Sequence, residues 1–210
     1  MWYNQGMDGQ EYLDQISASV KPIKAKRNGI FSSKFFMVGM IGLICLIIII
    51  ILGAILSGNK GGEKNLSYAL ALHIDNTAEV VKNYQNEIKS SNLRSSSASL
   101  YGVLADTSSK LTNYLTEKYG TKIKDADQKI IEQATLEKDG LESELFEAKI
   151  NGILDRIFTH KIAYEISVLM AEETEILEKT GNDDLKEILT TSYNSLSTLY
   201  SKFNDYSETN

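Results

Sequence analysis

Residues 35–56 (FFMVGMIGLICLIIIIILGAIL) form an apolar run that contains no charged side chain. A helix rises about 1.5 Å per residue, so this run would extend about 33 Å, enough to cross a bilayer core of about 30 Å. A soluble domain would have to bury such a helix on every side, and the rest of the chain is too polar to do so. We therefore predict a single transmembrane helix at residues 35–56.

Charge is divided unequally between the two sides of this run. Residues 1–34 carry five basic and three acidic side chains, a net charge of +2, whereas the residues after 56 carry 17 basic and 25 acidic ones, a net charge of −8. Basic residues within about 15 positions of a span favour the cytoplasmic side. Those before the run are Lys21, Lys24, Lys26, Arg27 and Lys34. The pattern predicts a plasma-membrane protein with a cytoplasmic N-terminus and an extracytoplasmic C-terminal domain.

The run is also longer than the apolar core of a cleaved signal peptide, which spans about 7–15 residues, so we expect an uncleaved signal anchor. The acidic outer domain argues against nucleic acid or anionic lipid as its ligand. The partners expected are the lipid bilayer, through the span, and a protein partner or a second copy of the chain. The only cysteine, Cys45, lies inside the run, so the outer domain is expected to have no disulfide.

The remaining segments differ in composition. Residues 1–34 are poor in apolar side chains and are predicted to be mostly disordered. Residues 57–64 (SGNKGGEK) are predicted to be a flexible linker. Residues 65–206 are expected to form the folded domain, and residues 207–210 a short tail.

Apolar residues recur at helical spacing throughout residues 65–206, and no strand-like alternation competes with them. Helices are expected over 66–88, from 100 to Gly120, from 125 to 139, from 141 to Gly181, and from 183 to 203. Asp139-Gly140 and Asn151-Gly152 are both possible breaks. Long amphipathic helices joined by short loops favour antiparallel neighbours. The sequence therefore predicts an all-α fold, an up-and-down bundle of four or five helices after the transmembrane helix.

The last of these helices has the clearest pattern. Its apolar-face residues follow a 4-3-4-3-4 spacing, with Asp183 expected as the N-cap, and they are Leu185, Leu189, Ser192, Leu196, Leu199 and Phe203. Tyr193 and Tyr200 border this stripe. They are expected to pack with their hydroxyls at the rim, or else to form an aromatic contact surface for a protein partner or a second copy.

Motifs that would indicate catalysis are absent from the sequence. There is no GxSxG, HExxH, CxxC or phosphate-binding glycine loop. His73 lies on an apolar stripe, where a hydrogen-bonded core histidine is commoner than a metal ligand, and His160 is expected at the surface. Neither has the glutamate three positions earlier that di-iron bundles use. Glu172, Glu173 and Glu175 are expected on a solvated helix face. We therefore predict no enzyme activity, no cofactor and no metal site, with His73 as the one candidate ligand.

Two resemblances add to this interpretation. Two stretches of the chain resemble small exported bacterial bundles that are ferritin-like in shape and classed as a domain of unknown function. They are residues 154–163, which begin Leu-Asp-Arg-Ile-Phe, and residues 181–196, which begin Gly-Asn-Asp-Asp-Leu-Lys. That family often has two histidines at positions that correspond here to Ile166 and Lys202, so the resemblance implies no metal role. The layout of the whole chain also resembles uncharacterised single-pass proteins of ultrasmall episymbiotic bacteria. It shares with them a short tail segment, Tyr12–Ile16 (YLDQI), followed by a basic stretch, an isoleucine-rich span and a helical domain.

These features favour a non-enzymatic interaction or envelope-organising module anchored in the membrane. One alternative is a ferritin-like metal-binding or stress-response bundle, which would require carboxylates to converge with His73 or His160 in the core. A second alternative is a ligand-sensing ectodomain that relays to a cytoplasmic partner, because the 34-residue tail is too short for a folded output domain.

Overall fold

The computed structural model describes residues 62–120 and 122–206. All of them belong to the second of the two units into which the chain divides, Gly58–Asn210. They form five α-helices and two short 3-10 turns, and no strand occurs among them: α3 (Gly62–Tyr84), η2 (Gln85–Glu87), α4 (Ser91–Tyr119), η3 (Ile123–Asp125), α5 (Gln128–Ile150), α6 (Leu154–Lys179) and α7 (Asp183–Asn204). The prediction of an all-α domain is confirmed.

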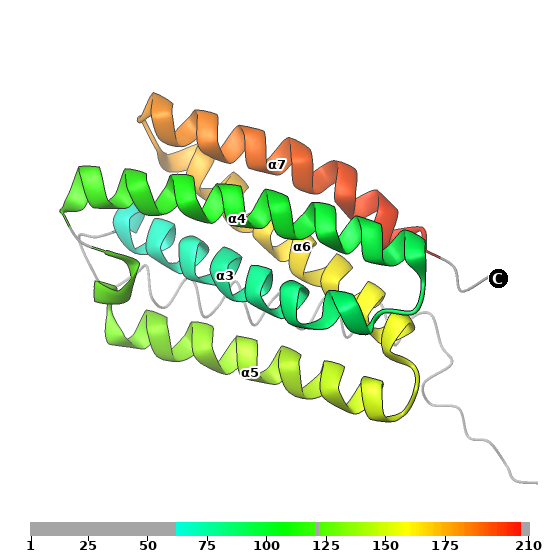
Figure 1. Ribbon diagram of the computed structural model, residues 1–210. Coiled ribbons are helices and arrows are strands. Elements are labelled where there is room, and N and C mark those ends of the chain that lie inside the picture. Colours follow the sequence, from blue (N-terminus) through cyan, green and yellow to red (C-terminus); the bar gives the residue numbers. More distant parts are fainter. Residues whose placement is uncertain (1–61, 121, 207–210) are drawn as a thin grey trace, which may run out of the picture. The chain divides into compact units, whose positions relative to one another are not determined.

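Successive helices run in opposite directions (Figure 1). Helices α3, α4, α7 and α6 contact one another in a closed ring of four, and α5 lies against α3 and α6 on the outside of that ring. Short connections between antiparallel helices are typical of this arrangement. The predicted span at residues 35–56 lies outside the described residues, and none of the helices described here is long and apolar enough to cross a membrane.

Helix α3 is buried on most of its circumference because three helices, α4, α5 and α6, pack against it. The residues at 4-3 helical spacing include Leu66, Leu70, Thr77 and Val81, all of which are buried, whereas His73 and Tyr84 of the same series are half-buried. Six further residues of α3 are buried as well: Ser67, Tyr68, Ala71, Ile74, Ala78 and Val80. A single amphipathic stripe therefore understates the burial of this helix.

Helix α7 agrees with its predicted stripe at every position. All six residues of the 4-3-4-3-4 series are buried. The ring of Phe203 packs at 6.4 Å, centroid to centroid, from that of Phe158 on α6. The N-cap is Asn182 and not Asp183, because the Asn182 side chain accepts a hydrogen bond from the Leu185 amide at 2.9 Å.

The two possible helix breaks have different outcomes. Helix α5 continues through Asp139-Gly140, whereas Asn151-Gly152 separates α5 from α6, and Gly152 adopts a left-handed φ of 71°. Gly120 ends α4 in the same conformation, as expected. Helix α3 begins at Gly62, so the segment expected as a linker, 57–64, overlaps its first turn.

Candidate functional site

The most unusual polar group of the domain lies where α3 meets α6. The imidazole of His73 lies between two carboxylates of α6: its Nδ1 is 2.9 Å from Glu172 Oε2 and its Nε2 is 2.9 Å from Glu165 Oε2. The two glutamates are seven residues apart, or about two helical turns, so they approach the ring from its two ends. The three side chains are only 11%, 18% and 15% exposed for His73, Glu165 and Glu172, respectively.

This geometry favours a charged histidine. A neutral imidazole has one N–H and could donate to only one of the two carboxylates, whereas the imidazolium donates to both. Burial alone would lower the pKa of His73, but the carboxylates of Glu172 and Glu165 outweigh it and raise the pKa well above 6.5. His73 is therefore a buried cation held between two anions.

A third carboxylate lies beside this group. Glu137 of α5 lines a small cavity of about 10 Å³ together with His73 and Glu165, a space for no more than about one water molecule. The side chain of Glu137 is exposed, but the loss of surrounding water where α5 packs against the other helices raises its pKa, while a hydrogen bond from Gln133 (2.7 Å) and the charge of His73 act against the shift. Three helices thus bring one cation and three acidic groups together.

The arrangement is better suited to holding a proton than to holding a metal. Both ring nitrogens of His73 already donate to carboxylates, so neither has a lone pair available for a metal ion. No group of three or more His, Cys, Asp or Glu side chains within residues 62–120 and 122–206 has the geometry to hold a metal. The inward convergence of carboxylates on His73 is nevertheless real, and it is the feature that the metal-binding alternative required.

Glu173, the neighbour of Glu172, points about 100° away from it around α6 and is completely buried. Within the described part of the chain, neither of its carboxyl oxygens has a hydrogen-bond partner, and the same is true of the hydroxyls of Ser67 and Ser192. Burial raises the pKa of Glu173 to about 8; the nearby Ser192 hydroxyl opposes the shift and the Glu172 carboxylate adds to it. Glu173 is therefore protonated and uncharged at neutral pH.

The expectation of a solvated acidic face at Glu172, Glu173 and Glu175 is thus wrong for the first two residues. Only Glu175 agrees with it, forming an i,i+4 ion pair with Lys179 at 2.5 Å. The reason is that α6 packs against α3, α5 and α7, so consecutive residues of one helix point into different interfaces. His160, by contrast, is exposed, as expected.

Tyr193 and Tyr200 of α7 line one groove with α6. The groove has a volume of about 260 Å³, and its other lining residues are Ser167, Met170, Ala171 and Thr174 of α6. Both tyrosines are partly exposed, and the Tyr200 hydroxyl donates a long hydrogen bond (3.4 Å) to Asn204 Oδ1. The groove therefore combines two aromatic side chains of α7 with Met170 and three small side chains of α6.

The membrane-flanking basic residues Lys21, Lys24, Lys26, Arg27 and Lys34 lie outside the described residues. Sequence reasoning did not identify Glu137 or Glu165 as partners of His73. A signal for Glu165 was available, because it precedes Glu172 by seven residues and so occupies the same face of α6.

No protein-family model matches this chain, and comparisons with curated proteins and with solved structures find nothing similar to it. The two resemblances drawn from residues 154–163, 181–196 and 12–16 therefore stay predictions.

Proposed function

We propose that this chain is a single-pass membrane protein whose helical domain, held outside the membrane by residues 35–56, is a non-enzymatic interaction module. The observation that favours this function is the groove between α6 and α7. Tyrosine and methionine are enriched in the cores of protein–protein interfaces, and a groove between two helices can admit a partner's side chains.

The polar core supports the same proposal. His73, Glu165 and Glu172 satisfy one another, and Glu173 is completely buried. Catalytic groups lie within reach of a reacting atom in an open cleft. Here His73, Glu165, Glu172 and Glu173 are largely buried, and the groove between α6 and α7 has no titratable side chain apart from its two tyrosines.

Site-specific photo-cross-linking of the full-length protein in intact cells tests this proposal. A benzophenone amino acid at Thr174 or Tyr193, in the groove, is expected to give a discrete adduct, and Tyr200→Ala should lower the Thr174 adduct yield about tenfold, as for an interface hot spot. Asp106 on α4 is the control position, because it is exposed and does not line the groove. Equal yields at Asp106 and Thr174, or no adduct at either groove position, would contradict the proposal.

A metal-binding or stress-response bundle is the second candidate, favoured by the carboxylates that converge on His73. Under the first proposal, the purified protein should contain no stoichiometric iron, manganese or zinc, and the ¹⁵N resonances of His73 should report a doubly protonated ring at pH 7. Metal near one equivalent, lost in His73→Gln and retained in His160→Gln, would establish the second candidate instead.

A further inference from the structure

Helix α5 has large apolar side chains on both of its faces. The inner face is buried against α3 and α6 through Ile130, Ala134, Leu141, Leu145 and Ala148. On the outer face Leu136 is 68% exposed, Phe146 56% and Ile150 69%. With Ile153 just after the helix, these are the only large hydrophobic residues exposed within the described part of the chain.

The three outer residues share one line along the helix. At about 100° per residue, Leu136, Phe146 and Ile150 fall within an arc of about 80°, and they span about 21 Å along the axis. Scattered single apolar residues on a surface need no explanation, but an aligned set on one helix is typical of a contact surface. Phe146 and Ile150 are an i, i+4 pair and Leu136 lies ten residues before Phe146, so the face offers a second helix apolar contacts at two separate levels.

The charges around this line are mostly acidic. Glu132, Asp139 and Glu147 are exposed and fall on the same side of the helix, and none of them forms an ion pair with another described residue. Glu132 accepts only a hydrogen bond from Gln128, at 3.1 Å.

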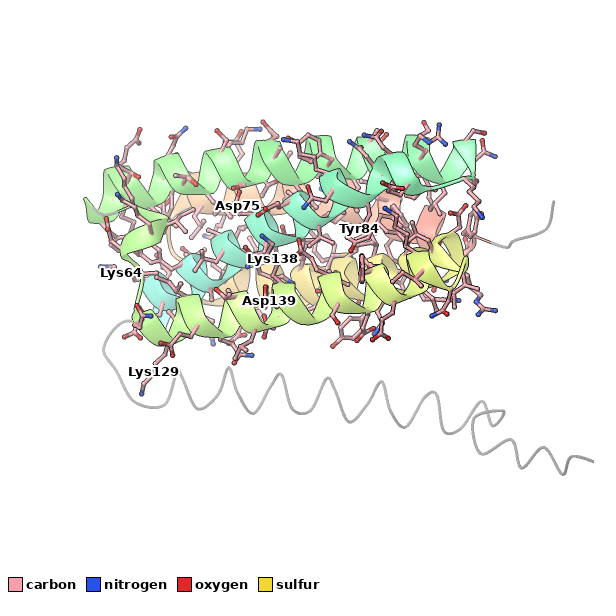
Figure 2. The ribbon with its side chains drawn as sticks, turned by 60° about the horizontal axis from the view of Figure 1, so that its bottom comes forward. Lys64, Asp75, Tyr84, Lys129, Lys138 and Asp139 are labelled. Carbon is pink, nitrogen blue, oxygen red and sulfur yellow. The ribbon has the colours of Figure 1, made fainter. Side chains whose placement is uncertain are left out.

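Two of the three lysines of α5 form ion pairs with glutamates of other elements and so do not balance the charge of the outer face. Lys138 reaches toward α3 (Figure 2). It pairs with Glu79 at 2.6 Å, and Lys149 pairs with Glu87 at 3.0 Å. Lys129, at the start of the helix, points away from the bundle (Figure 2). The outer face of α5 therefore carries the three apolar side chains together with acidic ones, and its net charge is negative.

We infer that the outer face of α5, built from Leu136, Phe146 and Ile150 with Glu132, Asp139 and Glu147, is a docking surface for a basic amphipathic helix of a protein partner. The apolar face of such a helix would cover the three hydrophobic side chains, and its lysine or arginine residues would face the three carboxylates. A second copy of α5 would bring the same acidic border against itself, and an anionic lipid surface would be repelled. This surface shares no residue with the groove between α6 and α7, so the inference does not depend on the proposed function.

A pair of designed peptides provides the test. Both are 18-residue amphipathic helices with the same leucine face, one with lysine and the other with glutamate on the polar face. The full-length protein in detergent should bind the lysine peptide, measured by fluorescence anisotropy, at least about tenfold more tightly than the glutamate peptide. Phe146→Ser with Ile150→Ser should weaken lysine-peptide binding at least about tenfold, the scale of interface hot spots.

Reversing the charge of the acidic residues on α5 distinguishes specific docking from non-specific binding. Asp139→Lys with Glu147→Lys should invert the preference between the two peptides, whereas Asp106→Lys with Glu117→Lys on the exposed face of α4 should leave it unchanged. Circular dichroism would verify that each variant stays folded. Equal binding of both peptides by the wild type, or an unchanged preference after the α5 reversal, would overturn the inference.

Two other occupants are distinguished by the same variants. If the wild type is a dimer by analytical ultracentrifugation and Phe146→Ser with Ile150→Ser converts it to a monomer, the occupant is a second copy of the chain. If the same variant abolishes binding to zwitterionic vesicles, the occupant is a lipid surface. Either result would replace the basic helix as the partner of α5.

Discussion

Replacement of His73 by alanine is expected to destabilise the helical domain by about 3–5 kcal/mol at pH 7, the usual cost of removing one partner from a buried ion pair. The variant leaves the carboxylates of Glu165 and Glu172, 18% and 15% exposed, without the cation that bridges them. Urea unfolding of the full-length protein in detergent, followed by circular dichroism, would measure the loss.

His160→Ala is the matched control, because His160 is the other histidine of the chain and is exposed on α6. It should change the free energy of unfolding by less than about 0.5 kcal/mol. Combining His73→Leu with Glu165→Gln and Glu172→Gln removes cation and anions together and should recover most of the loss. Equal losses for His73→Ala and His160→Ala would show that the bridge contributes nothing to stability.

The contribution of the bridge also has a defined pH dependence. The pKa of His73 is raised by folding, so its stabilisation is complete below the unfolded value of about 6.5 and is lost as the pH rises through the higher folded value. The difference in free energy of unfolding between the wild type and His73→Ala should therefore become smaller as the pH rises through the pKa of folded His73.

The helices could be predicted from sequence because apolar spacing reports how one face of a helix is buried. Helix α7 contacts α4 and α6 on one side, and its stripe from Leu185 to Phe203 was predicted without error. Helix α3 has three helices around it, so its additional buried residues, Tyr68 and Ile74 among them, do not follow a single stripe. Periodicity identifies helices but not the number of neighbours that each will have.

The polar site was less predictable for a related reason. An acidic residue is usually solvated, and nothing local distinguishes Glu173, which is buried, from Glu175, which pairs with Lys179 at the surface. The difference comes from the rotation of α6 between its neighbours, which depends on residues nearly 100 positions earlier in the chain, such as His73. The exposed apolar line of α5 was missed in the same way, since the sequence does not tell which of two apolar faces is buried.

Glu173→Gln is expected to make the protein more stable than the wild type at pH 8, by on the order of 3 kcal/mol, and to make little difference at pH 5. Folding raises the pKa of Glu173 from 4.5 to about 8, so the folded state retains a proton that the unfolded state releases. The stability associated with that proton is complete below about pH 4.5 and is lost as the pH rises to about 8. Glutamine is uncharged at every pH, so it removes this dependence.

Urea unfolding of both proteins at pH 5, 6, 7 and 8 would measure the difference, which should grow steadily with pH. Glu178→Gln removes the same charge from an exposed position of α6 and should run parallel to the wild type. Parallel curves for Glu173→Gln and the wild type would mean that the buried carboxyl is solvated or paired in solution. Because His73 and Glu173 both bind protons more tightly in the folded state, each loses stabilisation in the same direction, and only the two single variants measured together can separate their contributions.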